Sequence, residues 1–553
     1  MLDKSQADAL VYSTLCGFML VGLVAGYYTK TKREFFSGVR TQPDMSGSLL
    51  QSYPQLALIP NAGLLGISAY AFSTIAPLWA FAFLGPYIRR IAPDGFTLSE
   101  FIRRRYGWPI GVLSALVFVG FMFCFMWVEL NTYGSVVSTI GNVHPIVAPL
   151  IIAVTTTIYT AYGGFKASLW TDNVNAVVVV VFVIIAAIAI GTRLDVQLEG
   201  HEWPAWRDHM LVEGHSLGGQ LWYILTVAIV FAQMFNQGFW QRAFASRTNG
   251  GLYASVALAT VPLFAIVFIV GVSGPVAQWS GLQCPIDMDT QMAIPCSQND
   301  YDPAGSGDDG SFALFRILQV MPNWVQGITI VLAGVLSSSA YDTFQSAQIS
   351  VIQNDVFLGR LNIWWCRLIL VLINVPCVAL SSYNIDILQV FVVADLIGLA
   401  VIPCVFLGLP KFMYAYSGLD VVVGGCGGFL TLWVYGTIFY HDPVVGARIF
   451  SLPEGLYVND YSVLGAFFAA PLGCIGFALG SCGVRIACLW LYARFTNTEF
   501  TALDRPEVVD PASCVLPEDR PVSFLGFKGS GNPNDGHKLE DNESDEFHSP
   551  FHK

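Results

Sequence analysis

Long apolar segments alternate with short polar ones along this chain, and most are long enough to cross a bilayer. A transmembrane α-helix needs about 20 mostly apolar residues, and this criterion gives thirteen candidate spans in the sequence. We expect them at residues 9–28, 45–59, 64–88, 111–139, 146–162, 173–191, 221–235, 253–279, 324–355, 364–382, 387–409, 419–440 and 463–491. The pattern predicts an all-α polytopic membrane protein with about 13 transmembrane helices.

Composition supports this interpretation. Hydrophobic residues make up 54% of the chain and charged residues only 12%, whereas soluble domains carry about a quarter charged residues. The formal net charge of −12 offers no basic surface for nucleic acid. The lipid bilayer is therefore the expected environment, and nucleic acid is not an expected partner.

The distribution of Lys and Arg predicts the orientation, since positively charged loops stay cytoplasmic. Such residues follow the first span and the third span: Lys30, Lys32, Arg33, Arg40, Arg103, Arg104 and Arg105. We therefore expect the N-terminus outside and the C-terminus in the cytoplasm. Residues 493–553 are rich in Pro, Ser and acidic residues and are predicted to be a disordered cytoplasmic tail.

Two cysteines share the longest internal polar loop, which the same rule places outside. Cys284 and Cys296 are predicted to form a disulfide there, because an oxidising compartment favours disulfides. Two free thiols are the alternative. The other cysteines lie mostly in apolar spans, where they are expected to pack as small side chains.

The ninth span carries an unusual row of polar residues. Ser339, Asp342 and Thr343 lie in its second half, and an acid at mid-membrane costs about 2.5–3.5 kcal/mol on insertion scales. Small residues that let helices approach closely explain the serines of this row, but they do not explain Asp342. We expect Asp342 to bind a cation or a proton.

Two further acids lie inside predicted spans and raise the same question. Glu129 is either a structural hydrogen-bond partner or part of a functional site. Asp395 either belongs to a site or faces a water-filled vestibule.

The arrangement of spans two to eleven suggests an inverted repeat of two five-helix halves. Transporters of this kind bind substrates and ions where the first helix of each half is broken. Pro54 interrupts the second span, and Asn236, Gln237 and Gly238 interrupt the chain after the seventh. The alternative is that proline and glycine are simply common in membrane helices.

Several short motifs resemble those of the solute:sodium symporter family, and in particular its fungal urea-transporter branch. The matching residues are Tyr159, Thr160, Gly163, Gly164, Phe165 and Ala167, the segments 49–52 and 90–107, the segment 239–242, and Leu396, Ile397, Gly398, Ala400, Val401 and Pro403. The resemblance covers most of residues 9–490. It implies a transport core at residues 45–409, preceded by residues 1–44 and followed by two peripheral spans at 410–492.

The resemblance implies a plasma-membrane symporter in which a monovalent cation gradient drives uptake of urea or another small polar nitrogen compound. It places a cation between the first core helix and Ser339, Asp342 and Thr343, with Asp342 as the ligand that would hold sodium. Asp at this position departs from the family pattern and leaves proton coupling open. Gln51, Ser52, Glu129, Asn236, Gln237 and Asp395 are the expected substrate or gating residues.

Other classes of function have less support. The sequence shows no paired-histidine metal motif and no nucleophile motif, so we expect neither an enzyme nor a cofactor. A nutrient sensor that signals through the tail is the alternative from another class.

The second span is short by the standard of the resembling family. Only residues 41–48 separate Arg40 from the matching segment, so about half a helix is missing. Either the helix is truncated and the form is transport-defective, or a coding segment was wrongly removed.

Overall fold

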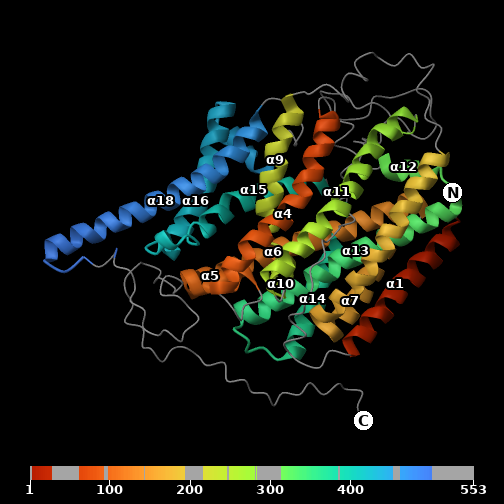
Figure 1. The fold of residues 1–553 in the computed structure, drawn as a ribbon, viewed down its shortest axis with the longest axis horizontal. Coiled ribbons are helices and arrows are strands. Elements are labelled where there is room, and N and C mark those ends of the chain that lie inside the picture. Colours follow the sequence, from red (N-terminus) through yellow and green to blue (C-terminus); the bar gives the residue numbers. More distant parts are fainter. Residues whose placement is uncertain are drawn as a thin grey trace, which may run out of the picture.

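The computed structural model describes residues 3–27, 62–91, 97–141, 143–193, 216–245, 248–280, 282, 313–383, 387–452, 461–500 and 503. Within these ranges the regular structure is entirely helical (Figure 1). The helices are α1 (Lys4–Tyr27), α4 (Gly63–Ile91), α5 (Leu98–Tyr106), α6 (Trp108–Gly141), α7 (Val147–Arg193), α9 (Ser216–Gln233), α10 (Gln237–Ala245), α11 (Asn249–Trp279), α12 (Ala313–Gln319), α13 (Asn323–Val351), the π-helix η1 (Ile352–Val356), α14 (Ile363–Leu380), α15 (Ile387–Phe406), the 3₁₀-helix η2 (Lys411–Met413), α16 (Gly418–Tyr440), α17 (Pro443–Gly446), the 3₁₀-helix η3 (Ala447–Ser451) and α18 (Ser462–Thr496).

The apolar pattern predicted these helices well. In the described part of the chain, ten helices are long and apolar enough to cross a membrane, and a shorter apolar helix covers Val390–Phe406. The fifth and sixth predicted spans both fall within α7, which contains a non-helical residue, Gly164, at φ 57° and ψ −146°. The predicted second span, residues 45–59, lies outside the described residues.

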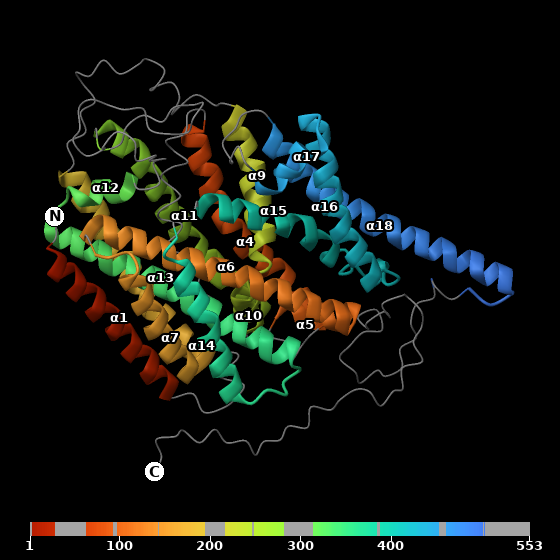
Figure 2. The ribbon, with the colours of Figure 1, turned by 180° about the vertical axis from the view of Figure 1, so that it is seen from behind.

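The helices form two groups that meet along the middle of the molecule. α4 packs against α9 and α11, whereas α13 packs against α6 and α7 (Figures 1 and 2). α1 lies along α7 and α13. We call α4, α9, α10 and α11 the broken-helix group, and α6, α7, α13 and α14 the α13 group.

Burial explains how α13 tolerates its polar residues. Of its most apolar 18-residue window, 78% is buried inside the protein, compared with 22% in α14. The polar side chains of α13 therefore meet protein groups instead of lipid, as backbone and side-chain polar groups in a bilayer require.

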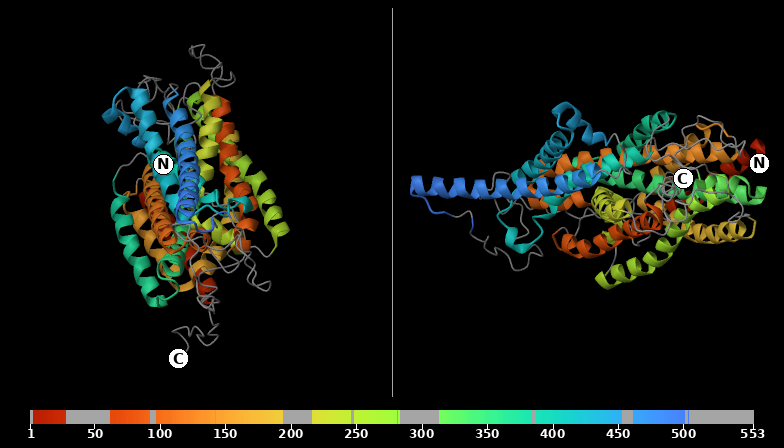
Figure 3. Two further views of the ribbon diagram at one scale, coloured as in Figure 1. Left: turned by 90° about the vertical axis from the view of Figure 1, so that its left-hand side faces the viewer. Right: turned by 90° about the horizontal axis from the view of Figure 1, so that it is seen from above.

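α16 and α18 pack against each other and against α15 at one end of the molecule, and α18 projects beyond the other helices (Figure 3). Asp420 and Arg485 join the two helices through an ion pair of 2.8 Å. α18 continues five residues beyond the predicted end of the thirteenth span at 491. Most of the predicted tail, residues 493–553, lies outside the described residues.

Candidate functional site

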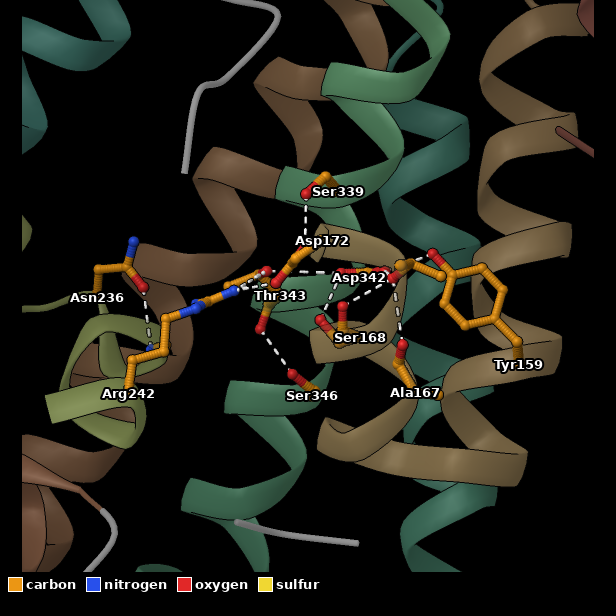
Figure 4. Close-up of polar contacts among 12 residues, drawn as sticks. Tyr159, Ala167, Ser168, Asp172, Asn236, Arg242, Ser339, Asp342, Thr343 and Ser346 are labelled. Carbon is orange, nitrogen blue, oxygen red and sulfur yellow. Dashed lines mark hydrogen bonds and ion pairs between the residues drawn. The ribbon is translucent and has the colours of Figure 1, made fainter. Parts of the chain in front are cut away.

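Asp342 lies at the centre of a cluster of hydroxyl groups between α13 and α7. Its carboxylate is fully buried and accepts hydrogen bonds from Tyr159 Oη at 2.5 Å, Ser168 Oγ at 2.7 Å and Thr171 Oγ1 at 3.0 Å (Figure 4). Three hydroxyl donors replace the hydration that the carboxylate loses in a bilayer. Asp342 therefore has hydrogen-bond partners within the protein, and its role in binding a cation or a proton stays a prediction.

The turn within α7 brings these three donors together. Tyr159 precedes Gly164 and Ser168 and Thr171 follow it, so the chain reverses between them (Figure 4). Gly164 has a positive φ that L-residues rarely adopt. A Cβ added at Gly163 would lie 2.6 Å from the Cα of Gly26, so this glycine lets α1 touch the turn. The glycine pair of the sequence motif thus has a defined structural purpose.

A second carboxylate, Asp172, lies beside Asp342. It is 4% exposed, forms an ion pair of 2.6 Å with Arg242 from α10, and accepts a hydrogen bond of 2.6 Å from Ser339 Oγ. Asp172 was not among the predicted site residues, because the predicted sixth span began at residue 173, which placed this acid in a loop. Its position eight residues after the glycine pair was the available signal.

Thr343 connects the two carboxylates. Its Oγ1 accepts a hydrogen bond of 2.9 Å from Arg242 Nη2 and lies 3.5 Å from an oxygen of Asp342. The connected cluster thus holds two carboxylates and one guanidinium, so it is one positive charge short of neutrality when all three are ionised. Its remaining groups are oxygens, which suit a hard monovalent cation. Ser339, Asp342 and Thr343, predicted as a set, do meet in this cluster.

The polar residues at the break between α9 and α10 form hydrogen bonds mainly with backbone groups. Asn236 precedes α10, and its Oδ1 accepts a hydrogen bond of 3.0 Å from the backbone N–H of Gly238. The side-chain amide of Gln237 donates to the carbonyls of Phe235 and Met234 and accepts from the backbone of Leu98. We expected both residues to contact substrate or to gate its path. In this structure their side-chain amides form hydrogen bonds with backbone groups of the protein.

Glu129 and Asp395 lie outside this cluster, on α6 and α15. Glu129 is 1% exposed, and Asp395 is partly buried and receives no hydrogen bond from the described residues. Each follows by four residues a phenylalanine, Phe125 or Phe391, whose ring centroids are 4.8 Å apart. Phe344 of α13 completes this aromatic contact at 5.7 Å from Phe125.

The remaining predicted site residues, Gln51, Ser52, Cys284 and Cys296, lie outside the described residues. Their assignments stay predictions.

Comparison with known proteins shows the family to which this chain belongs. The family model described as the sodium:solute symporter family matches residues 44–362. The chain belongs to the sodium:solute symporter family. The symporter is also 36% identical over 527 residues to the spermidine transporter DUR31 of Candida albicans, covering 92% of this chain and 95% of that protein.

Urea transporters match less of the symporter. The probable urea active transporter 1 of Schizosaccharomyces pombe is 26% identical over 34% of this chain and 31% of its own length. The urea active transporter of Saccharomyces cerevisiae is 30% identical over 24% of this chain and 18% of its own length. The expected family is confirmed, whereas the expected urea branch is similar only in part.

A solved structure confirms the fold of the symporter. A Na⁺-coupled sialic acid symporter superposes with a TM-score of 0.55 at 15% identity, covering 85% of this chain and 98% of that one. The symporter therefore has the helical transporter fold expected from its sequence. Its membership of a symporter family makes it a transporter and not an enzyme.

Proposed function

We propose that this symporter couples the entry of a monovalent cation, Na⁺ or H⁺, to uptake of a linear polyamine such as spermidine across the plasma membrane. The observation that carries the proposal is the 36% identity to a spermidine transporter over nearly the whole of both chains. The uneven distribution of Lys and Arg supports an outside N-terminus and a cytoplasmic C-terminus.

The cluster around Asp342 supports the cation part of the proposal. Thr171 Oγ1, which donates to Asp342, also lies 2.8 Å from the carbonyl oxygen of Ser168 and 3.2 Å from that of Ala167. The hydroxyl can therefore turn its hydrogen toward a carbonyl and offer its oxygen to a cation beside Asp342. The same side chains can therefore stabilise the Asp342 carboxylate with and without a bound cation.

The aromatic contact between α6 and α15 supports the polyamine part. α6 and α15 run in opposite directions, because Asn131 of α6 donates to the carbonyls of Ser381 and Tyr383 just before α15. At its other end, α15 accepts a hydrogen bond at Val405 from Tyr106, just before α6.

This antiparallel arrangement places an acid on each side of the phenylalanine rings. Glu129 lies four residues beyond Phe125 on α6, and Asp395 lies four residues beyond Phe391 in the opposite direction, which separates the acids by about 12 Å along the helices. A linear polyamine presents ammonium groups separated by methylene chains. Carboxylates pair with ammonium groups, and phenylalanine faces attract them and contact the methylenes.

Uptake measurements test the proposal. Cells without their own polyamine uptake should accumulate labelled spermidine when they make this protein, and unlabelled spermidine should compete far better than urea. Sodium and pH are varied independently to identify the coupling cation. Urea uptake without spermidine uptake would contradict the polyamine assignment.

A form that reaches the membrane but carries neither solute would support the transport-defective alternative. Restoring a full first core helix between Arg40 and Leu49 would then be expected to restore uptake.

A matched pair of variants tests the acid on α15. Asp395→Asn removes one carboxylate beside the rings, so we expect KM for spermidine to rise at least tenfold, which corresponds to about 1.4 kcal/mol. Glu499→Gln removes an exposed acid after α18 and should leave KM unchanged. Equal KM values for wild type and Asp395→Asn would exclude Asp395 from the polyamine path.

A further inference from the structure

We infer that Gln237 is a positioning residue that connects the break between α9 and α10 to the first residue of α5. Its contact with α5 helps to hold the two groups of helices together at the end of the molecule where α5 lies. Gln237 is fully buried. Its Nε2 donates to the carbonyl oxygens of Phe235 at 3.1 Å and Met234 at 3.4 Å, which the helix break leaves without helical partners. Its Oε1 accepts a hydrogen bond of 2.8 Å from the backbone N–H of Leu98, the first residue of α5. One side chain therefore links the broken helix to α5.

A side chain from the α13 group holds the same end of α5. Asp355, in the π-helix η1 at the end of α13, is fully buried. One of its carboxylate oxygens accepts hydrogen bonds from Thr97 Oγ1, at 2.7 Å, and from Ser99 Oγ. Its other oxygen is buried and has no hydrogen-bond partner among the described residues. A negative charge beside the first turn of a helix also interacts favourably with the helix dipole.

The start of α5 thus forms hydrogen bonds with both groups of helices. Gln237 begins α10, which continues the chain from α9 of the broken-helix group and packs against both α4 and α13. Asp355 belongs to the α13 group, and η1 packs against α6 and α5. α5 follows α4 and precedes α6 in the chain, so it is the connection between the groups as well as the element that both of them hold.

The two contacts differ in what breaking them requires. The Gln237 contact is one neutral hydrogen bond, whereas Asp355 accepts two bonds on a carboxylate, and charge-assisted bonds are about twice as strong as neutral ones. When the two groups separate on the α5 side, the Leu98–Gln237 bond breaks and α5 stays on Asp355. The Nε2 bonds of Gln237 to Phe235 and Met234 lie within the helix break, so they hold the side chain in place to accept the Leu98 N–H when the two groups close again.

Paired cysteines test this difference. A disulfide in L98C/Q237C joins α5 to the broken helix, and we expect it to lower the initial rate of spermidine uptake at least tenfold relative to the same protein after reduction. A disulfide in the matched pair T97C/D355C joins α5 to the α13 group, and uptake should stay within about twofold of its reduced form. The linked peptides are identified by mass spectrometry.

One result would overturn the inference. Full uptake by the oxidised L98C/Q237C protein would show that the contact need not open during transport.

Hydrogen exchange tests the contact without any solute, so its outcome stands apart from the proposed polyamine. In the purified protein, Gln237→Leu should speed exchange of the Leu98 amide at least tenfold. Gln348→Leu replaces another buried glutamine, one that bonds to the α6 backbone within the α13 group, and should leave that exchange unchanged. Equal exchange in wild type and Gln237→Leu would contradict the inference. A wild-type protein that takes up no spermidine would contradict only the proposed function.

Discussion

Two buried ion pairs in this symporter have nearly the same geometry and different surroundings. Arg242 and Asp172 lie 2.6 Å apart with side chains 2% and 4% exposed. Arg485 and Asp420 lie 2.8 Å apart with side chains 10% and 0% exposed. The first pair joins α10 to α7 beside Asp342, and the second joins α18 to α16 at the end of the molecule.

The surroundings decide what each pair can do. Asp420 accepts hydrogen bonds from the backbone and hydroxyl of Ser417 and from Ser481, and Arg485 bonds to the Ala415 carbonyl. These contacts cap α16 and leave a balanced pair of charges. The Arg242–Asp172 pair, in contrast, is linked through Thr343 to a further carboxylate. A buried ion pair alone is weak evidence of function, and the first pair differs from the second in its link to the further carboxylate of Asp342.

The largest expected effect comes from breaking each pair and then removing it completely. Asp172→Asn strands the buried Arg242, which should cost about 3–5 kcal/mol of stability, whereas removing both charges should restore most of it. D172N/R242Q should fold but transport at least tenfold more slowly, because one carboxylate of the cluster is gone. For the second pair, D420N/R485Q should be about as stable as the wild type and should transport at the wild-type rate.

Thermal unfolding in detergent and spermidine uptake measure these outcomes. Normal uptake by D172N/R242Q would show that the Arg242–Asp172 pair, like the Arg485–Asp420 pair, stabilises the protein but is not needed for transport.

Asp342→Asn sharpens the comparison because it removes the unbalanced charge without stranding a cation. We expect stability to change by less than about 1 kcal/mol, since the hydroxyl donors can bond to the amide oxygen. The apparent affinity for the coupling cation should fall at least tenfold. Sodium and proton titrations of initial uptake measure this affinity, and an unchanged titration would remove Asp342 from the cation site.

Tyr159→Phe should have a smaller effect of the opposite sign. The phenol stabilises the cation-free carboxylate by a hydrogen bond of about 1.5 kcal/mol or more, so its loss should make the cation bind several-fold more tightly. Tyr341→Phe is the matched control, because Tyr341 is also buried but donates to Asn374. Weaker cation binding by Tyr159→Phe would instead identify the phenol oxygen as a ligand.

Ser481→Ala is expected to have the smallest effect. It removes one hydrogen bond of 2.8 Å to Asp420, which should lower stability by about 1 kcal/mol and leave uptake unchanged. Reduced uptake at normal stability would connect the peripheral pair to transport.

The sequence predicted the helices because apolar length is a local property. The predicted spans at 364–382 and 419–440, for example, agree with α14 and α16 within two residues at each end. The unusual polarity of the ninth span likewise pointed to Ser339, Asp342 and Thr343 before any contact was known.

The partners of these residues could not be predicted in the same way. Tyr159, Ser168 and Thr171 are ordinary residues in an apolar helix, and only the reversal at Gly164 turns all three toward Asp342. Gln237 was recognisable as part of a helix break. Its partner Leu98 is an apolar residue that makes the contact through its backbone N–H, so its side chain gave no signal. Long-range contacts of this kind carry no local pattern in a single sequence.

The packing of α1 bears on the geometry of the cluster around Asp342. A Cβ added at Gly22 would lie 2.6 Å from Cγ of Tyr159, so the first helix presses directly on the ring whose hydroxyl reaches Asp342. Any side chain at position 22 would displace that ring. A side chain at position 22 would therefore move the phenol relative to the Asp342 carboxylate, and we expect such a change to alter the apparent affinity for the coupling cation.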